Sequence, residues 1–224
     1  MHVSIVRPDQ PSDRVDLCVV VDVLRATTTA VVLCHRFGRV RVVRSLDDLD
    51  QLPAHPVGHV MFSELAARPD LAIPHFDNSP VLARDVELDG RMPVLVTTNG
   101  TVAIDLAARF AHEVVLAAFV NLSAVVDYVR RCGVATVAVM PAGHVQQAER
   151  CVEDDGCAAA IAGELQVAPL DVTAVIASCR AEPRILQRAT RIAADVELCF
   201  AVDTIPVVPR VTPISNQRWF ELCG

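Results

Sequence analysis

The stretch that decides the fold lies at residues 17–37 and reads LCVVVDVLRATTTAVVLCHRF. Its first five residues are apolar and the run ends at the carboxylate of Asp22, which is typical of a buried strand followed by a polar turn. Residues 27–37 then have helical spacing, and the threonines at 27–29 can cap the first helical turn. This stretch therefore predicts a strand, a polar turn and a helix in direct succession.

The same pattern returns further along the chain. Residues 93–96 are apolar, residues 97–101 read TTNGT, and residues 102–110 have helical spacing. Other strands are expected at 40–43, 58–62, 114–118 and 136–140, and other helices at 46–52, 123–132, 148–162 and 174–194, the last interrupted at Pro183. Such alternation predicts an α/β fold with a mostly parallel or mixed sheet, helices on both faces, and a ligand crevice beyond the carboxyl ends of the strands.

The length and the last part of the chain complete this expectation. A chain of 224 residues falls within the range of one large domain, so a single α/β domain over residues 1–224 is predicted. Prolines stand at 206, 209 and 213. Because proline cannot donate a ladder hydrogen bond, residues 202–213 are expected to form an edge strand or an extended cover rather than a central strand.

The composition limits the classes of function. Hydrophobic residues make up 52% of the chain and aromatic ones only 4%, so Val, Ala and Leu must build the core. The net charge is −7 and the arginines are scattered, which argues against a nucleic-acid partner. No signal-peptide pattern and no apolar run of about 18 residues is present, so no membrane association is expected. Eight cysteines without a Cys-x-x-Cys pair predict buried free thiols in a cytoplasmic protein.

The chain has no lysine, so all 20 basic side chains are arginines. This excludes Schiff-base chemistry and a P-loop lysine, and it means that any cationic side chain holding an anion is an arginine. Genomic base composition is the simpler explanation of the deficit. The sequence also lacks the histidine spacings of zinc hydrolases, the Gly-x-Ser-x-Gly elbow and the Gly-x-Gly-x-x-Gly turn, which removes several enzyme classes.

The first polar turn offers groups that can hold a phosphate. Asp22 is costly to bury unless a cation or several donors meet it, so it is a candidate metal ligand. Arg25 is a candidate anion clamp, and Thr27 and Thr28 with the backbone N–H groups at the helix start are a candidate phosphate cradle. The alternative is that Asp22 and Arg25 pair with each other while the threonines only cap the helix.

The second turn repeats this chemistry with Thr97, Thr98, Asn99, Gly100 and Thr101. Asn-Gly permits a left-handed backbone, and the hydroxyls and exposed N–H groups around it can surround an oxyanion. An ordinary strand-to-helix turn would use similar residues. Because a parallel sheet would place both turns on one edge, the pair favours a shared oxyanion site.

Acidic residues elsewhere could complete a metal site. Glu64 follows an apolar segment, and Glu153 and Asp154 open an acidic run. Together with Asp22 they could supply the oxygen ligands that Mg²⁺ prefers, with phosphate and water filling the remaining positions. The alternative is that these acids lie on a solvated surface.

The motifs together resemble one family. The segments 22–29, 97–101, 119–121, 142–143 and 153–154 occur in the order seen in 2-phosphosulfolactate phosphatases. The resemblance implies a Mg²⁺-dependent acid phosphatase with a three-layer α/β/α fold, which acts on 2-phosphosulfolactate in the route to coenzyme M. A homodimer is the commonest assembly for such an enzyme.

The resemblance also singles out residues. It points to Asp22, the turn at 25–29, residues 97–101, Glu153 and Asp154. On this basis and on the chemistry of the side chains, we expect catalytic roles for Asp22, Arg25 and Asn99, metal binding by Asp22, Glu64, Glu153 and Asp154, and substrate binding by Thr27, Thr28, Asn78, Ser79, Thr97, Thr98, Gly100 and Thr101. Two segments depart from the family: residues 63–65 read Ser-Glu-Leu instead of Gly-Glu-Arg, and residues 75–80 are a shortened form of a Gly-Phe-Asp-x-Gly-Asn-Ser-Pro stretch. The substrate is therefore expected to be 2-phosphosulfolactate or a related phosphorylated hydroxy acid. A non-catalytic protein that binds phosphate or another small anion is the alternative.

Overall fold

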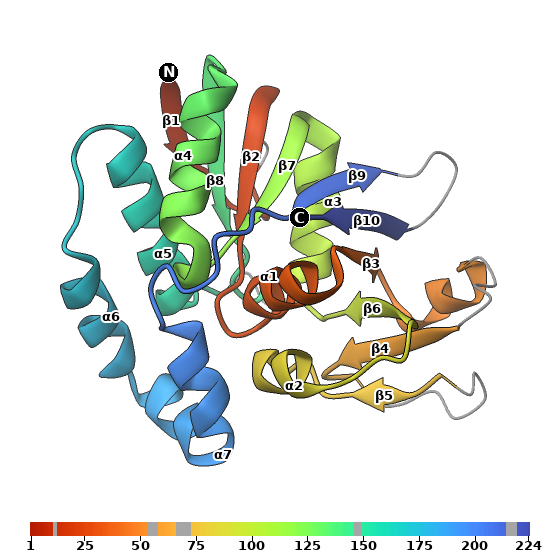
Figure 1. Ribbon diagram of the computed structural model, residues 1–224. Coiled ribbons are helices and arrows are strands. Elements are labelled where there is room, and N and C mark those ends of the chain that lie inside the picture. Colours follow the sequence, from red (N-terminus) through yellow and green to blue (C-terminus); the bar gives the residue numbers. More distant parts are fainter. Residues whose placement is uncertain (11–12, 53–57, 66–72, 146–148, 214–218) are drawn as a thin grey trace.

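The fold is described from a computed structural model, which covers residues 1–10, 13–52, 58–65, 73–145, 149–213 and 219–224 (Figure 1). The strands of these residues are β1 (His2–Ile5), β2 (Val15–Val21), β3 (Arg39–Val43), β4 (His59–Ser63), β5 (His75–Phe76), β6 (Met92–Val96), β7 (Ala111–Ala117), β8 (Thr136–Pro141), β9 (Arg210–Pro213) and β10 (Trp219–Cys223). They form one sheet in the order β1-β8-β2-β7-β9-β10-β3-β6-β4-β5. The expected mixed, mostly parallel sheet is confirmed.

Helices cover both faces of this sheet. They are α1 (Ala26–Phe37), α2 (Pro80–Asp85), α3 (Gly100–Phe110), α4 (Leu122–Cys132), α5 (Val152–Leu165), α6 (Val172–Arg180) and α7 (Pro183–Cys199), with short 3₁₀ turns η1 (Leu46–Gln51) and η3 (Phe119–Asn121). Because successive strand residues point to opposite faces, Leu17 and Val19 of β2 pack in the core with α4 and α5, whereas Cys18 and Val20 pack with α1 and α3. The three-layer α/β/α arrangement is therefore confirmed.

Two parallel groups of strands make up the sheet. Strands β1, β8, β2 and β7 pair in parallel, and so do β3, β6, β4 and β5. Between them, β9 and β10 pair antiparallel with each other and with β7 and β3. In Figure 1, β1, β2 and β8 run up and down the view and β4, β5 and β6 run across it, as strand twist accumulates over the sheet. The turns after β2 and β6 therefore come together because the two groups of strands cross. They do not lie on one edge of a continuous parallel sheet, which was the expectation.

The proline-containing end of the chain departs from its expected place. Strand β9 lies inside the sheet, so the prediction of an edge position is wrong for its residues. Proline is tolerated because Pro213 is the last residue of the strand and the other two prolines precede it. Residues 201–209 run over the end of β7, where Leu116 N–H donates to Pro209 O (2.9 Å) and Ile205 N–H to Val120 O (2.9 Å). Both bonds tie this segment to the backbone of residues 116–120.

Most expected elements are present with shifted ends. The helix expected at 148–162 begins at Val152, and residue 148 lies outside the described residues. The helix expected at 174–194 is two helices, because Pro183 occupies the first turn of α7. The sequence patterns missed strands β1, β5 and β10 and helix α2. No helix in the described part of the chain has both the length and the apolar character needed to cross a membrane. The single domain over 1–224 stays a prediction.

Candidate active site

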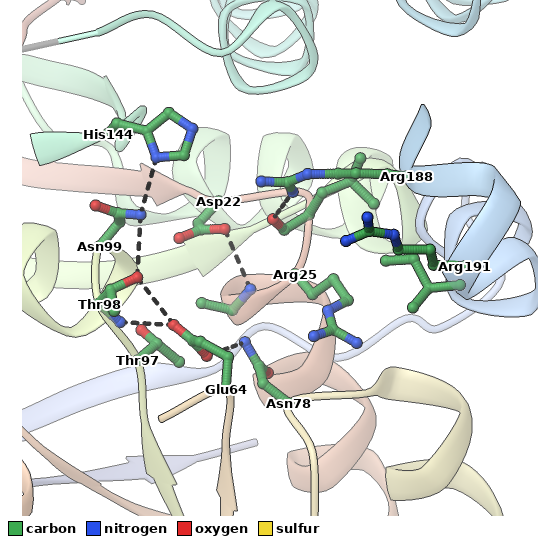
Figure 2. A pocket seen from close by; sticks show the side chains of 13 residues that line it. Asp22, Arg25, Glu64, Asn78, Thr97, Thr98, Asn99, His144, Arg188 and Arg191 are labelled. Atoms are coloured by element: carbon green, nitrogen blue, oxygen red, sulfur yellow. Dashed lines mark hydrogen bonds between the residues drawn. The ribbon is translucent and has the colours of Figure 1, made fainter. Parts of the chain in front are cut away.

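A pocket lies where the turns at the carboxyl ends of β2, from one group of strands, and of β4 and β6, from the other group, come together (Figure 2). Its volume is about 230 Å³. It is bounded by the turns after β2, β4 and β6, by the segment before α2, and by one face of α7. The lining residues are Asp22, Leu24, Arg25, Ala26, Glu64, Asn78, Thr97, Thr98, Asn99, His144, Arg188, Arg191 and Ile192. The structure thus brings seven of the sequence-predicted site residues to one cavity. The first and last of these seven, Asp22 and Asn99, are 77 positions apart in the sequence.

Asp22 lies at the carboxyl end of β2 and is 7% exposed. Its Oδ1 accepts a hydrogen bond from the Ala26 N–H at the start of α1 (3.2 Å). Burial raises the pKa of Asp22 to about 7; the bond from Ala26 acts in the opposite direction, and the carboxylates of Glu64 and Glu153 raise it further. Asp22 is therefore a carboxyl group at the pocket wall that a nearby cation would stabilise in its charged form.

The threonine hydroxyls next to Asp22 do not face the pocket. Thr27 Oγ1 accepts from Asp22 N–H (2.9 Å) and lies 2.7 Å from the Ala117 carbonyl oxygen. Thr28 Oγ1 donates to Val23 O (2.8 Å), and Thr101 Oγ1 donates to Thr97 O (2.6 Å). All three hydroxyls are buried. These hydroxyls hold the two turns in shape, and substrate binding by residues 27, 28 and 101 stays a prediction.

The second turn faces the pocket with Thr97, Thr98 and Asn99. Asn99 Oδ1 accepts from Val145 N–H (3.1 Å), and its Nδ2 donates to Thr98 Oγ1 (3.2 Å). Gly100 is not in the left-handed conformation that the Asn-Gly pair suggested. It is required for space, because a Cβ there would lie 2.4 Å from Ala26 Cβ and 2.9 Å from Asp22 Oδ2. The starts of α1 and α3 therefore touch beside Asp22.

Glu64 closes the lower side of the pocket in Figure 2. Its Oε1 accepts from the N–H (2.7 Å) and the hydroxyl (3.0 Å) of Thr98, and its Oε2 accepts from Asn78 Nδ2 (3.1 Å). Asn78 is 3% exposed, and its Oδ1 has no hydrogen-bond partner among the described residues. A buried acceptor without a donor is costly, so a donor or a cation from a ligand would complete it.

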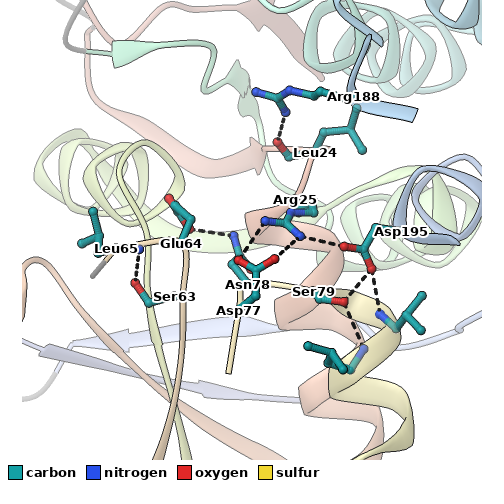
Figure 3. Close-up of polar contacts among 12 residues, drawn as sticks. Leu24, Arg25, Ser63, Glu64, Leu65, Asp77, Asn78, Ser79, Arg188 and Asp195 are labelled. Carbon is teal, nitrogen blue, oxygen red and sulfur yellow. Dashed lines mark hydrogen bonds and ion pairs between the residues drawn. The ribbon is translucent and has the colours of Figure 1, made fainter. Parts of the chain in front are cut away.

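Arg25 is neutralised by two acids (Figure 3). Its guanidinium binds Asp77 through two bonds of 2.7 and 3.1 Å and Asp195 of α7 through one of 2.7 Å. The alternative that Arg25 pairs with Asp22 is therefore wrong. Asp195 also accepts from Ser79 Oγ (2.6 Å), which caps α2 by accepting from Leu82 N–H (3.1 Å). Arg25 and Ser79 thus link α1, α2 and α7, and Ser79 does not line the pocket.

Glu153 and Asp154 are buried, at 4% and 2% exposure, in the first turn of α5. The two Oδ atoms of Asp154 accept from the N–H groups of Val23 (2.7 Å) and Gly143 (3.0 Å), so this carboxylate joins the turns after β2 and β8. Burial raises the pKa of Asp154 well above its ordinary value, and Asp22 and Glu153 add to the effect. Glu153 lines an adjacent cavity of about 200 Å³ that shares His144 and Arg188 with the pocket.

The side chains around the pocket are of types that bind a cation, but they do not form a preassembled set of metal ligands in the described residues. In the described ranges, no three His, Cys, Asp or Glu side chains are close enough to hold one metal ion together. However, burial raises the pKa of Asp22, Glu153 and Asp154, the Glu153 carboxylate raises the pKa of the other two further, and Asn78 Oδ1 lacks a donor among the described residues. Mg²⁺ commonly binds through one or two carboxylates, with substrate phosphate and water as the other ligands. The site is compatible with that mode of binding.

Sequence reasoning missed three polar residues of the pocket. His144 follows β8, and its Nδ1 lies 3.5 Å from Asn99 Nδ2. Arg188 and Arg191 come from α7, where Arg188 Nη1 donates to Leu24 O (2.8 Å). The signal for the arginines was present, since Arg184, Arg188 and Arg191 repeat at helical spacing and mark one face of α7 before Ile192, where the backbone leaves the helical conformation. Nothing local indicated which surface that face would meet.

The fold and the site together define a class of enzyme. The buried carboxyl group of Asp22, the exposed carboxylate of Glu64, the N-termini of two helices and arginines face one cavity of about 230 Å³ at the ends of strands of an α/β sheet. That arrangement suits the binding and hydrolysis of a small phosphate ester. It is the arrangement of a phosphoric monoester hydrolase.

Comparison with known proteins identifies the family within this class. The family model described as 2-phosphosulpholactate phosphatase matches residues 5–213, and the chain belongs to this family. A relative called probable 2-phosphosulfolactate phosphatase in Gloeobacter violaceus is 30% identical over 95% of this chain and 96% of its own length. Relatives with the same name in Synechocystis sp. (34% identical, 77% of this chain and 70% of the relative) and Deinococcus radiodurans (38%, 57% and 53%) match shorter parts. The last alignment thus spans only about half of that relative.

Proposed function

We propose that this protein hydrolyses the phosphate monoester of 2-phosphosulfolactate or a related phosphorylated hydroxy acid, with Mg²⁺ as cofactor. The observation that carries the proposal is the position of Asp22, a desolvated carboxyl group at the end of β2 beside the touching N-termini of α1 and α3. Membership of the phosphatase family supports it. The names of the relatives suggest the substrate.

Different parts of the pocket would bind the phosphate, bind the metal ion and position α7. The N-termini of α1 and α3 would bind phosphoryl oxygens and offset the charge that develops on them, whereas both donors of Thr98 are already taken by Glu64. Asp22, with Glu64 or Glu153, would hold Mg²⁺, which supplies Lewis-acid stabilisation when bound. Asp154 is the weaker candidate ligand because both its oxygens accept backbone N–H groups and it lines neither of the two cavities, whereas Glu64 and Glu153 each line one. Arg25 would act by positioning α7, because two acids occupy its guanidinium.

The first test replaces Asp22 by Asn, which keeps the side-chain oxygen that accepts from Ala26 N–H. We expect the kcat of phosphate release to fall by at least about 100-fold. The assay compares 2-phosphosulfolactate and phenyl phosphate, each with Mg²⁺ and with EDTA. Asp105→Asn is the matched control, because Asp105 is another buried acid but pairs with Arg44 and Arg109 outside the pocket. An Asp22→Asn variant with full activity would rule out this role.

A non-catalytic small-anion binding protein is the alternative function. The lack of a preassembled three-ligand metal cluster among the described residues favours it, as do the departures from the family at 63–65 and 75–80. Calorimetry with inorganic phosphate measures anion binding, and the phosphate-release assay measures turnover; the two results together distinguish the functions. Binding without release of phosphate from any ester tested would establish the alternative, and Mg²⁺-dependent turnover would exclude it.

The proposal also covers the cellular compartment and the oligomeric state of the enzyme. All eight cysteines are free thiols, which is typical of a reducing compartment such as the cytoplasm. There the product would enter the route to coenzyme M, and the enzyme would work as a homodimer. Sedimentation velocity measures the assembly directly, and a monomeric active enzyme would refute the dimer.

A further inference from the structure

The arginines of the pocket differ in what they bind. Arg25 is occupied by Asp77 and Asp195. Arg188 and Arg191 form no ion pair with any residue that the structure describes, although both line the pocket. A cationic side chain without a counterion at a concave site is available to an anionic ligand. The positive charge that a ligand would meet therefore comes from α7.

The geometry of α7 directs both arginines to the cavity. Residues three apart on a helix are neighbours on one face, so Arg188 and Arg191 project from the same side. Figure 2 shows both on the side of the pocket opposite Thr97, Thr98 and Glu64. The bond from Arg188 Nη1 to Leu24 O (2.8 Å) fixes one edge of its guanidinium and leaves other N–H groups for a ligand.

The two sides of the pocket thus have different chemistry. One side has Asp22 and the N-termini of α1 and α3, which suit a phosphoryl group. The other side has two guanidinium groups, whose planar forks match the oxygens of an anion, whether carboxylate, sulfonate or phosphate. A cavity of about 230 Å³ spans both sides. One small molecule with an anionic group at each end would contact both.

We propose that Arg188 and Arg191 form a second anion site, which binds the carboxylate or sulfonate of the substrate while the phosphate lies beside Asp22. The inference rests on the proposed function and deepens it. The arginine pair, rather than Arg25, makes the enzyme select substrates with an acidic group near the phosphate ester. Arg191 is the more informative residue of the two, because Arg188 also interacts electrostatically with Asp22 and Glu153.

The test measures selectivity. The ratio of kcat/KM for 2-phosphosulfolactate to kcat/KM for phenyl phosphate, which has no second acidic group, is determined for wild type, Arg191→Gln and the double variant with Arg188→Gln. We expect the ratio to fall about 10- to 100-fold in Arg191→Gln, mainly through a higher KM for 2-phosphosulfolactate, and further in the double variant. Arg191 is exposed, so this variant should fold normally, which a thermal melt verifies.

Arg184→Gln is the matched control. It removes the same charge about two turns before Arg191 on α7, from an arginine that pairs with Glu149 and does not line the pocket. The ratio should stay within about threefold of wild type, because a general field effect alone is screened by salt. An unchanged ratio in the double variant, or an equal fall in Arg184→Gln, would overturn the proposal.

The outcome remains informative if the proposed function fails. If wild type releases phosphate from neither ester, the same variants are titrated calorimetrically with 2-phosphosulfolactate and with phenyl phosphate. Preferential loss of 2-phosphosulfolactate binding in Arg191→Gln would support the second anion site without catalysis. Equal binding of that ligand by wild type and the double variant would reject the site, whatever the reaction.

Discussion

At the scale of single residues, the main feature is a group of desolvated carboxyl groups. Asp22, Glu153 and Asp154 are each at most 7% exposed, and burial is the first cause of the raised pKa of each. Carboxyl groups brought together in this way destabilise one another when charged. Their presence in the fold is understandable if a cation offsets that repulsion in the working protein.

This arrangement predicts a pH-dependent stability. The pKa of Asp22 is about 7 in the folded chain and 3.8 is its ordinary value, so between these pH values the folded state holds more protons than the unfolded state. Stability without metal should therefore fall as the pH rises from about 4 to above 7. Thermal melts in EDTA at pH 5.5 and pH 8 measure the loss, which Asp22→Asn should reduce and millimolar Mg²⁺ should oppose. Melting temperatures in EDTA that do not decline over this range would contradict the prediction.

At the scale of elements, the contact of α1 with α3 determines the shape of the pocket. The local patterns correctly indicated that both helices begin just after a polar turn. They did not indicate that the two helix starts touch, which requires Gly100 for reasons of space. The arginines of α7 are a similar case. Their helical spacing was visible in the sequence, but the sequence did not indicate that they would line the pocket.

Gly100→Ala should therefore damage the site. The new Cβ would lie 2.4 Å from Ala26 Cβ, so the helix starts must move apart, at a cost of about 1–3 kcal/mol and roughly 2–10 °C in melting temperature. Activity should fall as well, because the same Cβ lies 2.9 Å from Asp22 Oδ2. Adding Ala26→Gly removes the clashing methyl group and should recover part of the loss, which a double-mutant cycle quantifies. Full stability of the single variant would show that the contact is not tight.

At the scale of the whole molecule, a buried side chain anchors the segment that returns from α7 to the sheet. Asn121 is fully buried; its Nδ2 donates to Leu116 O (3.2 Å) and Val207 O (2.8 Å), and its Oδ1 accepts from Ala118 N–H (2.8 Å). It joins the end of β7 to residues 201–209, which lead into β9 and so to the second group of strands. The family motif around residue 121 thus has a structural role here.

Asn121→Ala should destabilise the whole fold. It leaves buried backbone groups without partners, for an expected loss of about 2–5 kcal/mol in the free energy of unfolding. Denaturant unfolding monitored by circular dichroism measures this loss. Ser123→Ala is the control, because Ser123 binds Asp203 of the same segment at the exposed surface and should cost much less. Equal losses in the two variants would argue against a special role for the buried amide.

The sequence by itself determined the strand–turn–helix units and the residues at their turns, because apolar periodicity and turn chemistry are local properties of the chain. It therefore placed Asp22 and Asn99 correctly at strand ends. Only the tertiary structure decided which polar groups face the pocket: Thr27 and Thr28 turn inward to backbone carbonyls, Arg25 is neutralised, and the arginines of α7 enter from a distant segment. Hydrogen-bond partners and counterions depend on the crossing of the two strand groups, which no local pattern specifies.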